Sequence, residues 1–374
     1  MNLRPTKDAI VVAMLASLLL FVAFNLQAGW VYAIVALLFG LLASGALTAV
    51  QGSRGITVIR TLPGEACEGD RIAVTLGLRT RRWPRFFLHL LEQMPGVEPV
   101  GSFVPILLPG RPHVLTFRTT ARRRGEHRGG TVVIHSFGLT GLFRAVRAMT
   151  VEGAITIFPR YWTLRRFPLP GRRQSSPDGF RRRSRSGTEF HGVREYRGGD
   201  PLARVHWRTT ARRGQLAVRE FEDDGSGGVT LLVDAREDCG DARSFEDLVR
   251  AAASVAHFVT QSGGAVRLVA GQAGGLLDAS GGWHDALRVL ARVSRHGGAP
   301  PSSVCEAAGL GADSPVVLFT CDAEAVPPLA RRTQHLVAVL AGMRQDAKLM
   351  LRSLGITACV LDPDDIGSSL ESLG

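Results

Sequence analysis

The stretch GTEFHGVREYRGGDPLARVHWRTTARRGQLAVREFEDD, residues 187–224, lies between two regions of different pattern and carries the densest charge of the chain. Asp200 and Pro201 predict the start of a short helix, because aspartate caps the free N–H groups of a first turn and proline suits the first helical position. Gly214 suits the end of this helix, since glycine readily takes the left-handed closing conformation. We therefore predict a helix between two strands, over residues 189–196 and 215–221.

Seven arginines and seven acidic residues lie within this stretch. A nucleic-acid-binding surface would carry a surplus of cations, so the balance favours ion pairs and hydrogen bonds within the protein and predicts no nucleic-acid partner. Guanidinium groups suit this role because they bind carboxylates through two parallel hydrogen bonds. The predicted members of the network are Glu189, Arg194, Glu195, Tyr196, Gly199, Asp200, His206, Trp207, Arg208, Arg212, Arg219 and Glu220.

The same stretch resembles the signature of the domain-of-unknown-function 58 (DUF58) family of prokaryotic proteins. Type and spacing agree at Glu189-Phe190, Arg194-Glu195-Tyr196, Gly199-Asp200-Pro201, His206-Trp207-Arg208, Ala211-Arg212 and Val218-Arg219-Glu220. The resemblance implies a C-terminal region like a von Willebrand factor A domain. It also implies a place among systems built around MoxR-type AAA+ ATPases, with transglutaminase-like membrane proteins nearby.

Composition excludes several kinds of chemistry. The chain has 374 residues, 45% of them hydrophobic, and a net charge of +12. Its only lysines are Lys7 and Lys348, so there is no phosphate-binding P-loop and almost no candidate for a Schiff-base lysine. The five cysteines are scattered without a Cys-x-x-Cys pair, which argues against a disulfide framework or a zinc site and favours a reducing compartment.

Two uncharged apolar runs, residues 9–26 and 30–50, predict a transmembrane helical hairpin, because a helix needs about 20 residues to cross a bilayer. A buried hairpin of a soluble core and a cleaved signal peptide are the alternatives. Arg4 and Lys7 precede the hairpin, Arg54 and Arg60 follow it, and the connecting turn is uncharged. Positive flanks stay inside, so we predict a multi-pass protein of the inner (cytoplasmic) membrane whose soluble domains are cytoplasmic.

The chain is predicted to hold five segments: a membrane anchor (1–55), a small all-β sandwich of immunoglobulin-like type (56–160), a basic linker (161–187), the family signature (188–224) and an α/β domain (225–374). Short apolar runs bounded by Pro and Gly predict the strands of the sandwich. They cover residues 56–62, 71–79, 86–93, 114–120, 131–135 and 154–158. Nine arginines and one acid occupy residues 160–187. This run is either a solvated charged segment or a contact for anionic lipid, and a contact for nucleic acid ranks behind both.

Strands and helices alternate after the signature, which predicts a parallel sheet covered on both faces. The predicted strands are 229–234, 265–270, 316–320, 335–340 and 356–361, and the predicted helices begin near Ser244 or cover 283–293, 324–332 and 345–354. His257 falls near an apolar helix face and is interpreted as packed rather than catalytic.

The resemblance to von Willebrand factor A domains implies a divalent-cation site at the carboxyl ends of two strands, with Asp-x-Ser-x-Ser after the first. Here the corresponding text is Asp234-Ala235-Arg236-Glu237-Asp238, without either serine, and Asp322 occupies the later aspartate position. Arg236 brings a permanent positive charge to the place of the metal. We therefore predict a degenerate site, and no metal or cofactor.

The candidates for catalysis are few, because no nucleophile and base share a recognisable context, and no catalytic residue is assigned. The resemblance favours a membrane-anchored, cytoplasm-facing adaptor or assembly factor that acts with a MoxR-type AAA+ ATPase. The alternative is a hydrolase that uses the segment from Asp200 to Arg212.

Overall fold

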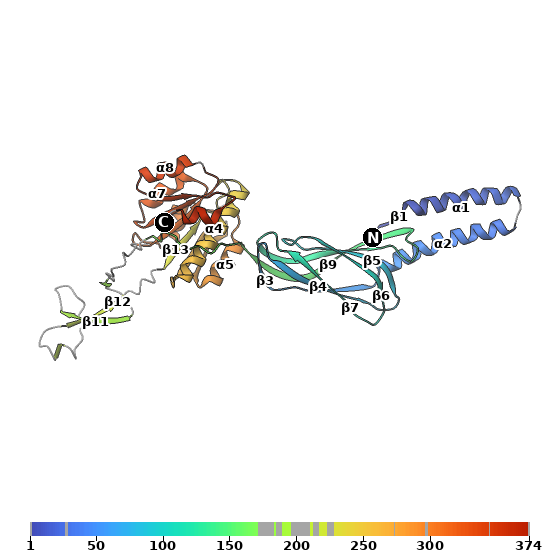
Figure 1. The fold of residues 1–374 in the computed structure, drawn as a ribbon, viewed down its shortest axis with the longest axis horizontal. Coiled ribbons are helices and arrows are strands. Elements are labelled where there is room, and N and C mark those ends of the chain that lie inside the picture. Colours follow the sequence, from blue (N-terminus) through green and yellow to red (C-terminus); the bar gives the residue numbers. More distant parts are fainter. Residues whose placement is uncertain are drawn as a thin grey trace. The chain divides into compact units, whose positions relative to one another are not determined.

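The computed structural model describes residues 2–26, 29–170, 183–184, 189–195, 210–211, 217–222, 228–272, 274–295, 298–343 and 345–372. The chain divides into two compact units, Met1–Pro159 and Arg160–Gly374 (Figure 1).

The first unit begins with two apolar helices, α1 (Lys7–Leu26) and α2 (Gly29–Ser53). Their most apolar windows have mean hydropathies of 2.2 and 2.3, and both are long enough to cross a membrane. Most of their side chains are exposed to the surroundings rather than packed inside the protein. The two predicted apolar helices are therefore confirmed as helices of membrane-spanning length.

The rest of the first unit is all β. One sheet has the order β1-β9-β8-β5-β6, with β3 beside β9, and the other has the order β2-β4-β7. The strand bounds are β1 Asn2–Pro5, β2 Ile56–Thr61, β3 Glu65–Cys67, β4 Arg71–Thr80, β5 Arg85–Gln93, β6 Val100–Leu107, β7 His113–Thr120, β8 Gly125–Ser136 and β9 Phe143–Phe158. Strands of both sheets supply one apolar core that includes Leu76, Leu88 and Ile134. All six predicted strands are present, and β1, β3 and β6 were not predicted.

The helix α2 is packed on the β strands of its own unit. Thr48 accepts a hydrogen bond at 3.4 Å from the backbone N–H of Leu139, in the turn between β8 and β9. Gly138 in this turn has φ +63°, and a Cβ there would lie 2.8 Å from the backbone nitrogen of Ala49. Only glycine allows this close approach without strain, so the last turns of α2 are fixed against the β part of the unit.

The signature stretch contributes two strands, β11 (Glu189–Glu195) and β12 (Ala217–Glu222), and β10 (Arg183–Ser184) precedes it in the chain. They form a separate antiparallel sheet in the order β10-β12-β11. Two of these strands are those that the sequence predicts on either side of the signature helix. Thr210 and Ala211, which belong to the predicted helix, are helical.

The second unit has a six-stranded sheet in the order β15-β14-β13-β16-β17-β18. The strands are β13 Val229–Val233, β14 Val266–Gln272, β15 Gly275–Gly281, β16 Val316–Thr320, β17 Leu336–Leu340 and β18 Thr357–Val360; the helices are α4 Ala242–Gln261, α5 Trp283–Arg292, α6 Pro301–Ala307, α7 Val326–Ala330, α8 Gln345–Ser353 and α9 Ile366–Glu371, with a 3₁₀ turn at Ala323–Ala325. All neighbouring strands are parallel except β15, which pairs antiparallel with β14. The sheet is therefore mixed, whereas the sequence predicted a parallel one, because β15 pairs antiparallel with β14 as an edge strand, with Gly275 opposite Gln272.

The predicted linker differs from the structure in its first part. Leu164 and Phe167 are buried, and Phe167 contacts Phe258 of α4 at a ring-centroid distance of 6.5 Å. Tyr161 contacts the His257 ring at 4.8 Å. Apolar side chains from this first part therefore pack on α4 of the second unit, whereas the sequence interpretation gave weight to the exposed arginines between them. His257 is packed, as predicted.

Candidate functional site

The candidate site lies at the carboxyl edge of the C-terminal sheet. Asp234 directly follows β13, and Asp322 follows β16 by two residues. The two strands are parallel neighbours, with Val233 opposite Phe319. Ligand sites in open α/β sheets occur at this edge because parallel strands bring their carboxyl ends together.

Arg236 joins the two aspartates. Its Nε donates to Asp234 Oδ1 at 3.0 Å and its Nη2 donates to Asp234 Oδ2 at 2.9 Å. The same Nη2 donates to Asp322 Oδ2 at 2.9 Å. Asp238 is more distant, with 3.6 Å between its Oδ1 and Nη1 of Arg236, and its side chain is 77% exposed. The guanidinium thus lies between the two carboxylates that follow β13 and β16.

Both oxygens of Asp234 have a full set of donors. Oδ1 also accepts from the backbone N–H of Arg236 at 3.2 Å, and Oδ2 accepts from the hydroxyl of Thr320 at 2.8 Å. The side chain of Asp234 is fully buried. A buried carboxylate is tolerated when its lone pairs are satisfied and a cation faces it. Asp234 is therefore neither a free base nor a free ligand while Arg236 is in place.

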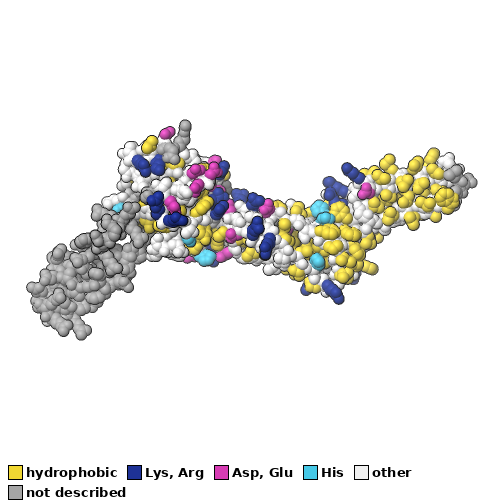
Figure 2. Space-filling view, viewed as in Figure 1, with side chains coloured by type: hydrophobic (Ala, Val, Ile, Leu, Met, Phe, Trp, Pro, Cys, Tyr) yellow, Lys and Arg dark blue, Asp and Glu magenta, His cyan; other side chains and the backbone are white. Residues whose placement is uncertain are grey.

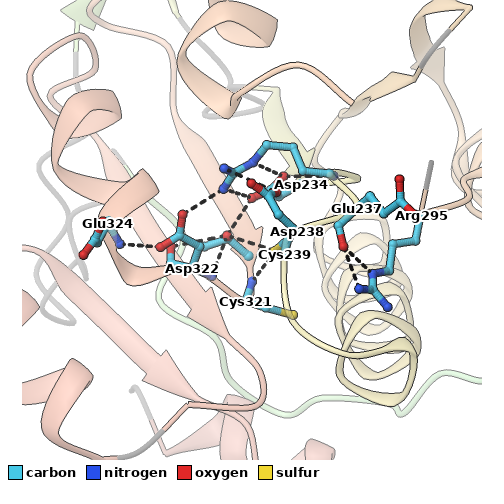
Figure 3. A network of polar contacts seen from close by, with 10 residues as sticks. Asp234, Glu237, Asp238, Cys239, Arg295, Cys321, Asp322 and Glu324 are labelled. Carbon is cyan, nitrogen blue, oxygen red and sulfur yellow. Dashed lines mark hydrogen bonds and ion pairs between the residues drawn. The ribbon is translucent and has the colours of Figure 1, made fainter. Parts of the chain in front are cut away.

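The electrostatics of the site are those of a strong ion pair. The hydrogen bond to Asp234 is the largest cause that raises the pKa of Arg236 above its usual value, and Asp322 raises it further. Asp322 Oδ1 accepts from the backbone N–H of Glu324 at 2.9 Å (Figure 3), which fixes the second carboxylate in turn.

The loop that carries Arg236 is held from two sides. Arg295 donates to the backbone carbonyl of Glu237 at 3.0 Å and 2.6 Å (Figure 3). Gly240 has φ +67°, and a Cβ there would lie 2.6 Å from Cβ of Cys321. The loop therefore needs glycine at this position, both for its backbone conformation and for space.

Thr320, Cys239 and Cys321 complete the site and were not predicted. The sulfur of Cys239 accepts from the backbone N–H of Cys321 at 2.9 Å and lies 3.6 Å from Oγ1 of Thr320. Because the Thr320 proton is donated to Asp234, the Cys239 thiol is the donor to Thr320. A hydrogen bond to Cys239 and burial raise the pKa of Cys321. The one signal in the sequence is that Thr320 ends a buried apolar run directly before Cys321-Asp322.

The predicted degenerate site is thus brought together in space, with Asp234, Arg236 and Asp322 in direct contact. Within the described ranges, no group of three or more His, Cys, Asp or Glu side chains is arranged to hold a metal ion. Hard cations prefer six or more oxygen ligands, whereas each oxygen of Asp234 is already bonded to protein donors. That the site has lost an ancestral metal remains a prediction.

The predicted network of the signature is only partly visible. Glu189, Arg194, Glu195, Arg219 and Glu220 lie on β11 and β12, where Val193 is opposite Arg219 and Gly192 is opposite Glu220. Tyr196, Gly199, Asp200, His206, Trp207, Arg208 and Arg212 lie outside the described residues. The side-chain contacts of the network therefore stay a prediction.

Comparison with known proteins agrees with the resemblance of the signature. Residues 192–315 match the model of the family described as "Protein of unknown function DUF58". The uncharacterized protein YeaD of Bacillus subtilis (strain 168) is 27% identical over 236 residues, which cover 60% of this chain and 56% of YeaD. The chain thus spans a little over half of the length of this curated relative.

Among solved structures, the CARDB domain of a Pyrococcus furiosus protein, crystallised with di-metal ions, aligns with 27% of this chain and 91% of its own. The identity is 11% and the TM-score is 0.20, which is too low to indicate a common fold. The family match agrees with the resemblance of the signature to DUF58 proteins: the matched residues 192–315 include most of β11, all of β12, and Asp234 and Arg236.

Proposed function

We propose that this DUF58 protein is a membrane-anchored, cytoplasm-facing adaptor or assembly factor that acts together with a MoxR-type AAA+ ATPase. The observation that carries the proposal is the contact of Arg236 with Asp234 and Asp322. The side chain of Arg236 fills the sheet edge where an α/β domain of this kind would otherwise present a ligand site. A unit without that site acts through its surfaces, which is what an adaptor requires.

Two features support an anchored protein built from interaction modules. The helices α1 and α2 have membrane-spanning length and are joined by an uncharged turn. We interpret the β part of the first unit as an immunoglobulin-like sandwich and the second unit as von Willebrand A-like. The two facing β sheets around one core favour the first interpretation, and the parallel strands with helices between them favour the second.

The proposed cytoplasmic orientation rests on the positive flanks of the helices, with one correction. Arg60 does not belong to these flanks, because it is buried inside the β unit and pairs with Glu92 at 2.5 Å. Arg4, Lys7 and Arg54 remain at the ends of the hairpin. Protease added to intact spheroplasts should leave the chain after residue 55 uncut, and lysis should expose it. Cleavage in intact spheroplasts would contradict the orientation.

Copurification tests the adaptor role. The full chain with a small tag is purified in mild detergent from its native membranes, and the bound proteins are identified. An AAA+ ATPase should be recovered in a fixed ratio and should bind the purified chain again in an ATP-dependent way. The variant Asp200→Ala is prepared in parallel to test the hydrolase alternative. If the lone chain instead hydrolyses a small molecule and Asp200→Ala abolishes this turnover, the hydrolase alternative replaces the adaptor.

A further inference from the structure

A pocket of about 320 Å³ lies at the C-terminal end of α2 in the first unit. Four arginines line it: Arg54 follows α2, Arg81 and Arg82 lie in the turn between β4 and β5, and Arg85 begins β5. Trp83 lines it as well, and no acidic residue is among the described residues that form its walls. The pocket is thus strongly cationic, and its size falls within the usual range of sites for small ligands, roughly 300–1,000 Å³.

Arg85 is the buried arginine of this pocket, and its guanidinium lacks a hydrogen-bond partner at one nitrogen within the described part of the chain. It is only 8% exposed, and its Nε is buried without a hydrogen-bond partner among the described residues. Burial alone lowers the pKa of Arg85, with no carboxylate acting against it. By contrast, the buried guanidinium of Arg60 in the same unit faces the carboxylate of Glu92. A buried cation is unfavourable unless an anion and hydrogen-bond acceptors face it, so an anionic ligand would stabilise Arg85.

The position of the pocket indicates where this anion comes from. The last turn of a membrane-spanning helix lies at the level of the lipid headgroups. Trp83 is 65% exposed beside the arginines, and tryptophan is enriched at this level because its ring is apolar and its N–H is polar. Both features are those of a protein surface that meets the interface of a bilayer.

An exposed apolar surface adjoins the same end of α2. The rings of Phe87 and Phe103 stack at a centroid distance of 6.5 Å, and both side chains are exposed. The backbone carbonyl of Phe87 accepts at 3.4 Å from Phe137, which lies two residues before the Leu139 contact with α2. Figure 2 shows apolar side chains gathered on the part of this unit next to the helices. Apolar patches of this kind mark contact surfaces rather than ordinary solvated ones.

The backbone of Phe87 supports a functional reason for this surface. Its φ is +49°, and among the described residues it is the one non-glycine residue with a positive φ. Side chains other than glycine rarely adopt this conformation, and such strain concentrates at binding sites. The fold therefore keeps an aromatic ring outward at an unfavourable backbone angle.

We propose that Arg54, Arg81, Arg82 and Arg85 bind the phosphate headgroup of an anionic phospholipid in the leaflet from which α2 emerges. The guanidinium groups donate to the phosphate oxygens, as arginine does in other phosphate sites. The absence of acids from the described walls of the pocket disfavours headgroups that carry a choline or ethanolamine cation. Phe87, Phe103 and Trp83 meet the acyl and glycerol region beside it. This inference takes from the proposed function only that α1 and α2 cross a bilayer.

Native mass spectrometry of the full chain in detergent tests the proposal by counting bound lipids as phosphatidylglycerol or phosphatidylcholine is titrated. One phosphatidylglycerol should be retained at concentrations where phosphatidylcholine is not. Because a hydrogen bond to a charged group is lost, Arg85→Gln should weaken this retention roughly tenfold or more. The matched control is Arg118→Gln, which changes an exposed arginine of β7 opposite Ala73. It should bind like the parent.

Three outcomes would overturn the proposal: equal retention of both lipids, parent-like binding by Arg85→Gln, or displacement of the lipid by an equal concentration of inorganic phosphate. The last result would assign the pocket to free phosphate. If circular dichroism shows that Arg85→Gln does not fold, lipid retention is measured instead with Arg54→Gln and Arg82→Gln, which change exposed arginines of the pocket. Carbonate extraction of the parent from membranes distinguishes failure of the membrane anchor from failure of the lipid site. Release of the chain would contradict the anchor. Retention of the chain together with no lipid preference would contradict only the lipid site.

Discussion

Arg236 and Asp234 form a side-on pair in which two parallel hydrogen bonds, at 3.0 Å and 2.9 Å, join one guanidinium to one fully buried carboxylate. Asp322, 86 residues after Arg236, accepts a further hydrogen bond from the same guanidinium. The pair places a permanent positive charge at a sheet edge that ends in two aspartates. It also determines what mutation of the site should do.

Arg236→Ala should destabilise the second unit by about 3 kcal/mol, because it leaves Asp234 buried without its cation. Pulse proteolysis of the full chain across a urea series measures this loss. Arg243→Ala is the control: Arg243 is 72% exposed and lies 3.8 Å from Asp364, so its loss should change the free energy of unfolding by less than about 1 kcal/mol. Equal effects of the two substitutions would show that the Arg236 pair contributes nothing particular.

Divalent cations should give no specific heat with the parent chain. Each oxygen of Asp234 already accepts two hydrogen bonds, so a metal would have to displace Arg236. Titration calorimetry with Mg²⁺ and Mn²⁺ measures this directly. Detection of one site per chain at micromolar affinity would contradict the idea that Arg236 takes the place of a metal cation. A metal would then have to be included in any mechanism.

The buried pair of Arg60 and Glu92 should show a pH-dependent response to mutation. Arg60→Met leaves Glu92 buried and unpaired, which should cost about 3–5 kcal/mol at pH 7. The double variant Arg60→Met/Glu92→Leu should be close to the parent in stability, because it removes both charges. Urea-dependent proteolysis of the parent and the two variants measures these differences.

The sign of the pH effect follows from the burial of Glu92. Burial raises its pKa above 4.5, and Arg60 offsets part of the rise. A carboxyl group whose folded pKa is raised stabilises the folded state below the unfolded pKa, and this contribution is lost as the pH rises through the folded pKa. The loss caused by Arg60→Met should therefore shrink at pH 4. A loss that stays constant between pH 4 and pH 7 would show that it does not come from the charge of Glu92.

We expect the central residues of the signature to stabilise the fold rather than to take part in catalysis. If Trp207 and Arg208 are buried in the network, Trp207→Ala and Arg208→Ala should each cost roughly 3–5 kcal/mol. Asp200→Ala should cost about 1 kcal/mol, the typical value of a helix cap. Melting of the full chain and its protease sensitivity check this order. Variants that melt like the parent but abolish function in cells would favour the hydrolase alternative.

The elements that the sequence predicts best are those whose side chains share one environment along their whole length. The run 316–320 is buried at every position and is strand β16 as predicted. The runs 9–26 and 30–50 carry no charge along their whole length, and they lie in the helices α1 and α2 as predicted. The strands β6 and β15 escaped prediction because Pro105 interrupts the pattern of the first and glycines and Asp278 dilute that of the second.

The candidate site was predictable in its members but not in its contacts. The sequence placed Asp234, Arg236 and Asp322 at strand ends through the family resemblance. It did not predict that the Thr320 hydroxyl would bind Asp234, because the side-chain direction of Thr320 depends on its register beside β13. The start of α4 shows the same limit: Asp241 caps it by accepting from Ser244 at 2.7 Å, a few residues before the predicted start.

The sequence by itself determined the two membrane-length helices, most strands of both units and the DUF58 signature, because local periodicity and motif spacing are properties of short segments. Only the tertiary structure brought Arg54 and Arg85 into one pocket and made Arg60 a buried partner of Glu92 instead of a membrane flank. The physical reason is that burial and charge pairing depend on which strands become neighbours. That choice is made by the packing of a whole core, and no single segment contains it.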